Sequence, residues 1–352
     1  MKKRIAVLLC FMLAVLTVLT GCGGHREASA SADGGQESDQ LQAEGEPLTE
    51  VTLNEVAHSI FYAPQYVALE KGYFQEEGLE VTLVNGFGAD KTMAALLAGE
   101  ADIGFMGAEA SIYAYQEEAN DTVVNFAQLT QRAGNFLVAR EEMPDFTWEE
   151  LKGATVLGGR KGGMPEMVFE YILKKNGIDP EKDLEIEQGI DFGSTAAAFS
   201  GGQGDFTVEF EPAATALEQE GAGYVVASCG VDSGYVPYTA YSAKSSYMEE
   251  NPQVIRKFTN ALQRGMDYVN SHTPEEIARV IQPQFTENDL ETITTIVERY
   301  QQQDTWKENL VFEQDSFELL QDILESAGEL EKRVDYAALV DTSYAVQAAG
   351  IE

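Results

Sequence analysis

Two acidic residues near the middle of the chain, Glu209 and Glu211, are candidates for binding chemistry. Because residues two apart in a strand point to the same face, both carboxylates would lie on one side of a strand. They could accept hydrogen bonds from a ligand that carries amino groups, and a solvated sheet edge or a salt bridge at a hinge fits equally well. Arg160 and Lys161 are the candidate partners of such a bridge, or part of an anion site.

Aromatic and acidic residues also stand where two helices begin. Phe61 and Tyr62 come directly before a helix whose first turn contains Pro64, and they could either contact a ligand or pack over that helix. Glu166 follows the Met164-Pro165 pair that opens another helix. A carboxylate at this position satisfies free backbone N–H groups, so capping and ligand contact both remain open.

The cysteine and histidine content argues against a metal site. Cys10 and Cys22 lie in and directly after an apolar N-terminal run, which leaves Cys229 alone in the rest of the chain. No intrachain disulfide and no thiolate cluster are therefore expected, and a buried structural thiol is a commoner role for such a residue than a nucleophile. The three histidines, His25, His58 and His272, lack metal-ligand spacing. We predict no metal and no cofactor.

Alternating strand and helix patterns position these residues. The first block predicts a strand over 51–57, a helix from Ala63 to Gly72, a strand over 79–84, a helix capped by Asp90 and stopped by Gly99, and a strand over 103–105. The second block predicts a strand over 155–157 and a helix that begins at Met164 and ends with Lys174 and Lys175. Such alternation indicates an α/β fold with mainly parallel sheets.

An internal similarity indicates two lobes of one design. Residues 94–103 align with residues 197–206 at an offset of 103, and both segments read as a helix, a glycine turn, an aspartate and a strand. Beyond residue 241 the chain is helical, and one face of the first long helix is apolar: Ile255, Phe258, Leu262, Met266 and Val269. We expect residues 48–138 and 240–352 to form lobe 1, residues 139–239 to form lobe 2, and the two crossings to act as a hinge.

The charge of the chain excludes one large class of partners. The sequence has 59 acidic against 23 basic residues and a formal net charge of −36. Nucleic acids and anionic membrane surfaces are bound through clustered Lys and Arg, so a field this negative repels them. With 44% hydrophobic and 23% charged residues, the chain can still bury a substantial core.

The N-terminal sequence has the pattern of a secretion signal. Three basic residues precede an apolar run over 5–20, which is too short for a bilayer span and typical of a signal peptide. The sequence Leu19-Thr20-Gly21-Cys22 is similar to the bacterial lipobox, which implies a signal peptide over 1–21 and a lipid, including palmitate, on Cys22. Residues 22–47 predict a disordered tether because they are rich in Gly, Ser, Ala, Gln and acid. A secretory signal with an incidental Cys is the alternative.

Several motifs in a fixed order resemble one known family. They are Phe61-Tyr62-Ala63-Pro64-Gln65-Tyr66, Leu97-Ala98-Gly99-Glu100-Ala101-Asp102-Ile103-Gly104, the glycine-rich stretch 158–166, Phe210-Glu211-Pro212 and Val236-Pro237-Tyr238-Thr239. Together they make the chain similar to the SsuA/THI5-like (NMT1/THI5-like) solute-binding proteins of ABC importers. The resemblance implies a type II periplasmic-binding-protein fold, in which two lobes joined by a hinge close on a small molecule.

The resemblance also implies where the ligand would bind. In open α/β sheets, ligands bind beyond the carboxyl ends of the strands, where loops and helix N-termini meet. In the first lobe these positions are Ser59, Phe61, Tyr62, Phe87, Gly88, Gly107 and Glu109. In the second lobe they are Gly163, Met164, Glu166, Phe192, Ser194, Thr195, Glu209 and Glu211, with Tyr238 at the return crossing.

The function implied is that of a non-catalytic, monomeric receptor for an importer. It would be held outside the cell membrane by the lipid on Cys22, on a Gram-positive type of surface, and would deliver a small organic solute to a permease and its ATPase. The aromatic and acidic candidates favour a thiamine-related pyrimidine precursor slightly over a sulfonate, taurine or nitrate. A THI5-like pyrimidine-synthesising enzyme is disfavoured because the chain lacks a cysteine-rich motif. A surface lipoprotein without a transport role is the third alternative.

Overall fold

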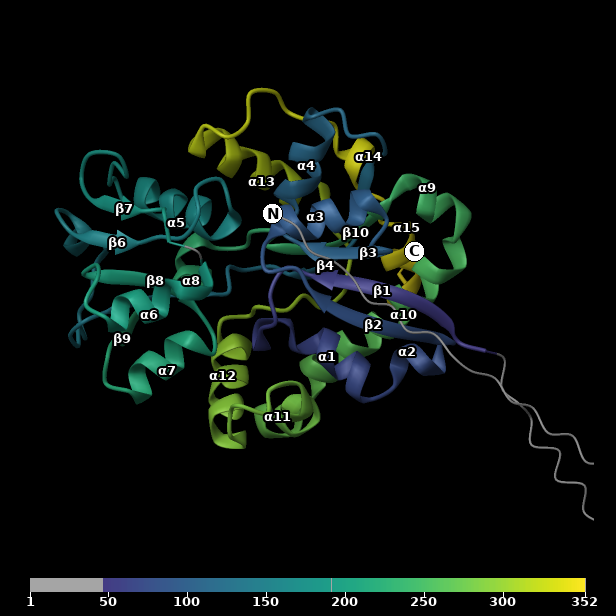
Figure 1. Cartoon of the computed structure of the whole chain (residues 1–352), viewed down its shortest axis with the longest axis horizontal. Coiled ribbons are helices and arrows are strands. Elements are labelled where there is room, and N and C mark those ends of the chain that lie inside the picture. Colours follow the sequence, from purple (N-terminus) through teal and green to yellow (C-terminus); the bar gives the residue numbers. More distant parts are fainter. Residues whose placement is uncertain (1–46, 191, 352) are drawn as a thin grey trace, which may run out of the picture. The chain divides into compact units, whose positions relative to one another are not determined.

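The strands of this chain form two separate sheets of five strands each. A computed structural model describes residues 47–190 and 192–351, so the predicted signal peptide, Cys22 and nearly all of the tether lie outside the described residues. The strand orders are β2-β1-β3-β10-β4 and β7-β6-β8-β5-β9. Figure 1 shows the second sheet on the left of the view and the first at its centre.

The first sheet is built from β1 (Thr49–Glu55), β2 (Leu79–Asn85), β3 (Ile103–Met106), β4 (Val123–Thr130) and β10 (Thr239–Lys244). Its early connections are η1 (Ile60–Tyr62), α1 (Ala63–Glu70), α2 (Tyr73–Glu76), α3 (Ala89–Ala98) and α4 (Glu109–Gln116). Helices α1 and α2 lie on one face of the sheet, and α3 and α4 lie on the other (Figure 1). The predicted helix that begins at Ala63 is confirmed.

The second sheet is built from β5 (Asn135–Ala139), β6 (Thr155–Leu157), β7 (Glu185–Glu187), β8 (Phe206–Phe210) and β9 (Tyr224–Ser228). Its helices are η2 (Trp148–Leu151), α5 (Met164–Lys175), η3 (Phe192–Ser194), α6 (Thr195–Ser200), α7 (Ala213–Gln219) and α8 (Cys229–Ser233). The sheets change between Thr130 and Asn135, a few residues before the boundary expected at 138, and again between Ser228 and Thr239.

Both sheets are mixed, and for the same reason. The strand that arrives after each crossing, β5 in the second sheet and β10 in the first, runs antiparallel to both of its neighbours. The other pairs, β1 with β2 and β3, and β6 with β7 and β8, are parallel as the alternating pattern indicated. The two sheets therefore share one strand arrangement.

The internal repeat extends to individual hydrogen bonds. Asp102 Oδ2 accepts from the backbone N–H of Thr52 at 2.8 Å, and Asp205 Oδ2 accepts from the backbone N–H of Thr155 at 2.9 Å. In each half the backbone N–H of the aspartate also donates back to the carbonyl of the same threonine. Because both pairs are related by the offset that aligned 94–103 with 197–206, the two lobes repeat one structural unit, as the sequence predicted.

The C-terminal part is helical, as expected. It comprises α9 (Ser245–Glu250), α10 (Pro252–Ser271), α11 (Pro274–Ile281), η4 (Gln282–Gln284), α12 (Leu290–Gln302), α13 (Gln314–Ala327), α14 (Tyr336–Leu339) and α15 (Ser343–Ala349). The predicted apolar face of α10 is buried, and α10 packs on α1, where a Cβ on Gly265 would lie 2.2 Å from the Pro64 carbonyl oxygen. The tail is not confined to the first lobe, since α13 packs against α5.

One helix start differs from its prediction. The helix α3 begins at Ala89 with Gly88 as its N-cap, so Asp90 lies inside the first turn and makes no capping bond. Gly88 has a φ of 144°, a conformation that favours glycine, and the helix therefore begins two residues earlier than a cap at Asp90 would place it. Among the described residues, no helix is both long enough and apolar enough to cross a bilayer.

Candidate functional site

A cavity lies where the two lobes meet. Its volume is about 190 Å³. The first lobe contributes Ala57, His58, Ser59 and Tyr62, and the second lobe contributes Gly193, Ala196, Glu209, Phe210, Glu211, Pro212 and Ala213. The walls come from the loop after β1, the short helices η3 and α6, and the end of β8, which are carboxyl-end positions of the kind expected from the fold.

Ser59 joins the two lobes across this cavity. Its hydroxyl donates to the carbonyl oxygen of Glu211 at 2.8 Å. Ser59 Oγ also accepts from the backbone N–H of Phe61 and so caps η1, while the backbone N–H of Ser59 donates to the Tyr66 hydroxyl at 3.2 Å. Because η1 is fixed in this way, the ring of Tyr62 is held in the cavity wall.

Glu209 is the principal charged group of the cavity wall. The residue is 1% exposed, and Thr207 Oγ1 donates to its Oε1 at 2.6 Å. Burial raises the pKa of Glu209 to about 7, while the hydroxyls of Thr207 and Thr195 lower it. None of the described residues that line the cavity is a Lys or an Arg. A group with N–H donors would therefore stabilise the ionised carboxylate there.

Glu211 has a different role from Glu209. Its Oε1 lies 2.5 Å from Arg299 Nη1 of α12, and its other oxygen accepts from the backbone N–H of Thr215 at 2.9 Å. The same arginine bonds Glu218 at 3.0 Å. The carboxylate of Glu211 thus forms the hinge salt bridge left open by the sequence, although the partner is Arg299 rather than Arg160 or Lys161. The residue still contributes its carbonyl to the contact with Ser59.

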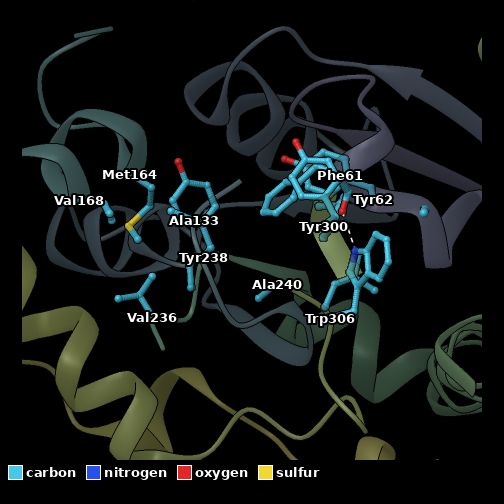
Figure 2. Close-up of a cluster of buried hydrophobic side chains, with 14 of the residues drawn as sticks. Phe61, Tyr62, Ala133, Met164, Val168, Val236, Tyr238, Ala240, Tyr300 and Trp306 are labelled. Carbon is cyan, nitrogen blue, oxygen red and sulfur yellow. Dashed lines mark hydrogen bonds between the residues drawn. The ribbon is translucent and has the colours of Figure 1, made fainter. Parts of the chain in front are cut away.

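Phe61 is packed inside an aromatic cluster and does not line the cavity. Its ring centroid lies 5.2 Å from Tyr300 and 5.7 Å from both Phe210 and Tyr238. Figure 2 shows Phe61 beside Tyr62 and Tyr300, with Trp306 Nε1 donating to the Phe61 carbonyl at 2.9 Å. The packing interpretation therefore fits Phe61, whereas Tyr62 takes part in both the packing and the cavity.

Sequence reasoning missed a charged group at the cavity, His58. Its Nδ1 lies 2.8 Å from Glu55 Oε1 and its Nε2 lies 2.9 Å from the carbonyl oxygen of Gln284. Both neighbouring atoms are acceptors, so both ring nitrogens can donate to them only in the protonated imidazole, the form that the hydrogen bond to Glu55 favours. The hydrogen bond to Glu55 raises the pKa of His58 above its ordinary value, against the effect of burial. The sequence feature that could have pointed to this pair is the position of Glu55 at the carboxyl end of β1, where ligands bind in such sheets.

A second group of predicted residues meets at the junction of α4 and α5. Glu109 is 3% exposed, and burial raises its pKa to about 7, although Arg160 and the backbone N–H groups of Glu109 and Met164 lower it. A Cβ on Gly107 would lie 2.0 Å from Glu109 Oε2, so the glycine lets this carboxylate fold back. Glu109 of the first lobe therefore lies against the start of α5, next to Gly163 and Met164, which were also predicted as ligand-binding residues.

Glu166 stabilises the glycine-rich loop before α5. Its Oε2 accepts from the backbone N–H of Gly162 at 3.2 Å, and its Oε1 accepts from Gln188 Nε2 at 2.7 Å. Burial and the neighbouring Glu170 raise its pKa to about 8. These partners match the capping interpretation of Glu166.

The remaining predicted residues are spread around the junction. Phe87 is 74% exposed, with Gly88 beside it, and neither lines the cavity. Thr195 is buried and its hydroxyl acts on Glu209, while Ser194 is exposed. The side chain of Phe192 lies outside the described residues. Tyr238 is buried at the return crossing, as expected.

Residues 303–305 brace both crossings between the lobes. Gln303 Nε2 donates to the carbonyl of Ala133 in the first crossing at 3.1 Å, and its Oε1 accepts from Ser228 Oγ at the start of the second, at 2.7 Å. The backbone N–H of Gln131 donates to the carbonyl of Thr305. The hinge is therefore held by a third segment. The described residues contain no group of three His, Cys, Asp or Glu side chains that could hold a metal ion.

Comparison with known proteins shows which family this chain belongs to. The sequence model described as "NMT1/THI5 like" matches residues 60–277. The putative binding protein YtlA of Bacillus subtilis is 47% identical over 300 residues, which cover 85% of this chain and 90% of YtlA. The chain belongs to the NMT1/THI5-like family, and the resemblance stated from its motifs is confirmed.

The chain is also similar, at lower sequence identity, to a sequence relative and to a solved structure. The 4-amino-5-hydroxymethyl-2-methylpyrimidine phosphate synthase of Candida albicans is 22% identical over 228 residues, 61% of this chain and 65% of the synthase. The alkanesulfonate-binding protein SsuA of Xanthomonas axonopodis pv. citri, solved with MOPS bound, has a TM-score of 0.68 at 16% identity over 84% of this chain and 99% of SsuA. The predicted periplasmic-binding-protein type of fold is thereby confirmed.

Proposed function

We propose that this protein is the extracytoplasmic substrate-binding lipoprotein of an ABC importer. It captures a small organic solute between its two lobes and delivers it to a permease that works with an ATPase. A lipid on Cys22 holds it at the cell membrane, as the lipobox-like sequence indicates. The support is the family, the 47% identical relative named as a binding protein, and a cavity whose walls come from both lobes.

The favoured solute is a thiamine-related pyrimidine precursor. The observation that carries this choice is Glu209, a buried carboxyl in a cavity wall that has no Lys or Arg among its described residues. A carboxylate in that position favours a ligand with amino groups and repels a sulfonate or nitrate. The volume of about 190 Å³ is below the 300–1,000 Å³ typical of pockets for drug-sized ligands, which suits a single ring.

Tyr62 completes the chemistry of this cavity. Its ring gives the solute an aromatic face at the cavity wall. Burial raises the pKa of Tyr62, so the hydroxyl stays protonated and can donate to a ring nitrogen. The synthase of Candida albicans, a distant relative, carries an aminopyrimidine in its name.

An enzymatic function is the disfavoured alternative. The whole sequence contains three cysteines, two of them in or next to the signal, and so lacks a cysteine-rich motif. Cys229 is buried, and burial raises the pKa of its thiol, so it stays protonated and unreactive. The 47% identical relative is named as a binding protein, which agrees with a receptor.

A thermal-shift panel tests the proposal. Binding to the folded state adds about 2.7 kcal/mol to the free energy of unfolding at a ligand concentration 100 times Kd. We expect 4-amino-2-methylpyrimidine to raise the melting temperature saturably, and an alkanesulfonate and nitrate to leave it unchanged. A shift with the sulfonate alone would contradict the ligand class. A flat response to a broad panel of small solutes would favour a surface lipoprotein without a transport role.

A further inference from the structure

Besides Arg132 Nε in the first crossing, three buried residues at the junction of the lobes have polar atoms without a hydrogen-bond partner among the described residues. The atoms are Glu109 Oε2, both amide atoms of Asn135, and the hydroxyl of Tyr238. The exposed fractions of these residues are 3%, 0% and 3%. Because nearly all buried polar groups in folded proteins are paired, three such residues in one region require an explanation.

The three residues come from different parts of the chain and lie around one group of rings. Glu109 begins α4, Asn135 begins β5 directly after the first crossing, and Tyr238 ends the second crossing. Asn135 is paired with Phe210 across the sheet, so their side chains share a face. The Phe210 ring lies 6.1 Å from that of Tyr238.

This group adjoins the cavity. Phe210 and Tyr62 line the cavity, and Tyr62 contacts Phe61, whose ring is 5.7 Å from both Phe210 and Tyr238. The charge of Glu109 acts on the hydroxyls of both Tyr62 and Tyr238. Figure 2 shows Tyr238 between Met164 on one side and Phe61 with Tyr62 on the other. The three residues thus lie around the aromatic rings that adjoin the cavity, although none of them lines it.

The position of these atoms between the lobes explains why they lack hydrogen-bond partners. An unpaired buried donor or acceptor destabilises the folded state relative to a hydrogen-bonded one, because the group has lost its bonds to water and gained none. These atoms lie at a junction between lobes, which separate by hinge motion in proteins of this fold. Separation of the lobes would expose the atoms to water, and a solute bound between the lobes would supply the hydrogen-bond partners that the protein itself does not.

We propose that Asn135, together with Glu109 and Tyr238, reads the hydrogen-bonding edge of the bound solute. This inference rests on the proposed function and names the side chains that select its ligand. The carboxamide of Asn135 offers a donor and an acceptor side by side, which match an amino group next to a ring nitrogen. Asn and Gln use the same two-bond match to read adenine. Glu109 accepts a further N–H, and the Tyr238 hydroxyl donates to an acceptor.

The same set discriminates against oxyanions. A sulfonate has acceptors and no donors, so it could accept from Tyr238 and from one side of the Asn135 amide. It would leave the Asn135 oxygen and Glu109 Oε2 unpaired. Sites built to hydrogen-bond a ligand group reject analogues that lack it, because their own buried polar atoms then stay unpaired. Selectivity for amino-bearing rings follows.

The test replaces the amide with an apolar side chain of similar size, Asn135→Leu, in the full-length protein. Calorimetry is carried out with 4-amino-2-methylpyrimidine and with 2-methylpyrimidine, which lacks the amino group. We expect wild type to prefer the amino compound at least about tenfold, and Asn135→Leu to bind it at least about 30-fold more weakly and to lose the preference. Without ligand, the melting temperature of Asn135→Leu should equal or exceed that of wild type, because an unpaired amide has been removed.

A control variant separates loss of ligand binding from the general effect of removing a buried amide. Gln128 is buried in β4 and also has an unpaired amide oxygen, but its Nε2 donates to the Thr130 carbonyl at 2.9 Å and it does not line the cavity. Gln128→Leu should therefore lower the melting temperature and leave the affinity unchanged. If Asn135→Leu fails to fold, Asn135→Ala removes the same amide without adding bulk, and the same outcomes apply.

The inference and the proposed function can fail separately. If wild type binds the aminopyrimidine and Asn135→Leu binds it equally well, the inference is overturned and the proposed function stands. If wild type binds a sulfonate instead, the ligand class fails, and an unchanged sulfonate affinity in Asn135→Leu overturns the inference as well. A melting temperature several degrees lower for ligand-free Asn135→Leu would show that the amide has protein partners, which overturns the inference whatever the ligand.

Discussion

Removal of the Arg299 guanidinium should destabilise the hinge side of the cavity strongly. The carboxylate of Glu211 is fully buried, and Arg299 Nη1 lies 2.5 Å from its Oε1. In Arg299→Met that charge would keep only the backbone N–H and the hydroxyl of Thr215, at 2.9 and 3.0 Å. Burial already raises the pKa of Glu211, which shows how poorly its charge is solvated.

The size of the effect follows from burial. Removal of one partner from a buried ion pair costs about 3–5 kcal/mol. The Arg299 side chain is 26% exposed, so water can partly replace it, and we expect a loss of about 2–4 kcal/mol in the free energy of unfolding. Domains of 150–250 residues lose roughly 2–4 °C in melting temperature per kcal/mol, a slope that gives a decrease of about 4–16 °C.

Urea unfolding and thermal melts of three variants test this reasoning. The double variant Arg299→Met/Glu211→Gln removes the stranded charge as well and should recover most of the loss. Arg333→Met is the matched control, because Arg333 pairs with Asp322 and Glu325 at the surface, where ion pairs contribute little. A shift below about 1 kcal/mol in Arg299→Met, or a double variant less stable than the single one, would refute the account.

Three further predictions concern the same region. Because the pKa of His58 is raised in the folded state, its charged form adds stability that is fully present below pH 6.5 and is lost as the pH rises through the folded-state pKa. His58→Gln should therefore lower the melting temperature at pH 6 and much less at pH 9. A difference in melting temperature that does not depend on pH would contradict this. Ser59→Ala removes the hydrogen bond to the Glu211 carbonyl across the lobes, so solute affinity should fall about fivefold, as expected for about 1 kcal/mol, and equal affinity in calorimetry would count against a closed bound state. Cys229 should resist a thiol reagent in the native protein and react only after unfolding, and rapid native labelling would show that the thiol is accessible.

The repeated architecture was readable from the sequence because its signals are local. Glycine at the end of α3, paired lysines at the end of α5 and the aspartates of the two repeats lie within a few residues of the elements that they define. Such signals depend on backbone conformation and helix ends, which neighbouring residues determine. The two-lobed arrangement then follows from repetition of one unit.

The polar chemistry of the site was less predictable because its partners are distant in sequence. Glu211 meets Arg299 across 88 residues, and His58 meets the Gln284 carbonyl across 226. No local pattern indicates that Asn135, at the start of an apolar strand, is buried without partners. Glu209 was found because strand alternation and the carboxyl end of a strand are local properties, whereas the choice between Arg160 and Arg299 depends on packing.

The most direct test of the central claim is calorimetric titration of 4-amino-2-methylpyrimidine into wild type and Glu209→Gln, side by side. The account predicts saturable binding at one site in wild type. It predicts binding at least about tenfold weaker in Glu209→Gln, because a hydrogen bond to a charged acceptor contributes about 1.5–3 kcal/mol. Tight binding of an alkanesulfonate with no heat from the aminopyrimidine, or equal affinity in the two proteins, would contradict a carboxylate-centred site between the lobes.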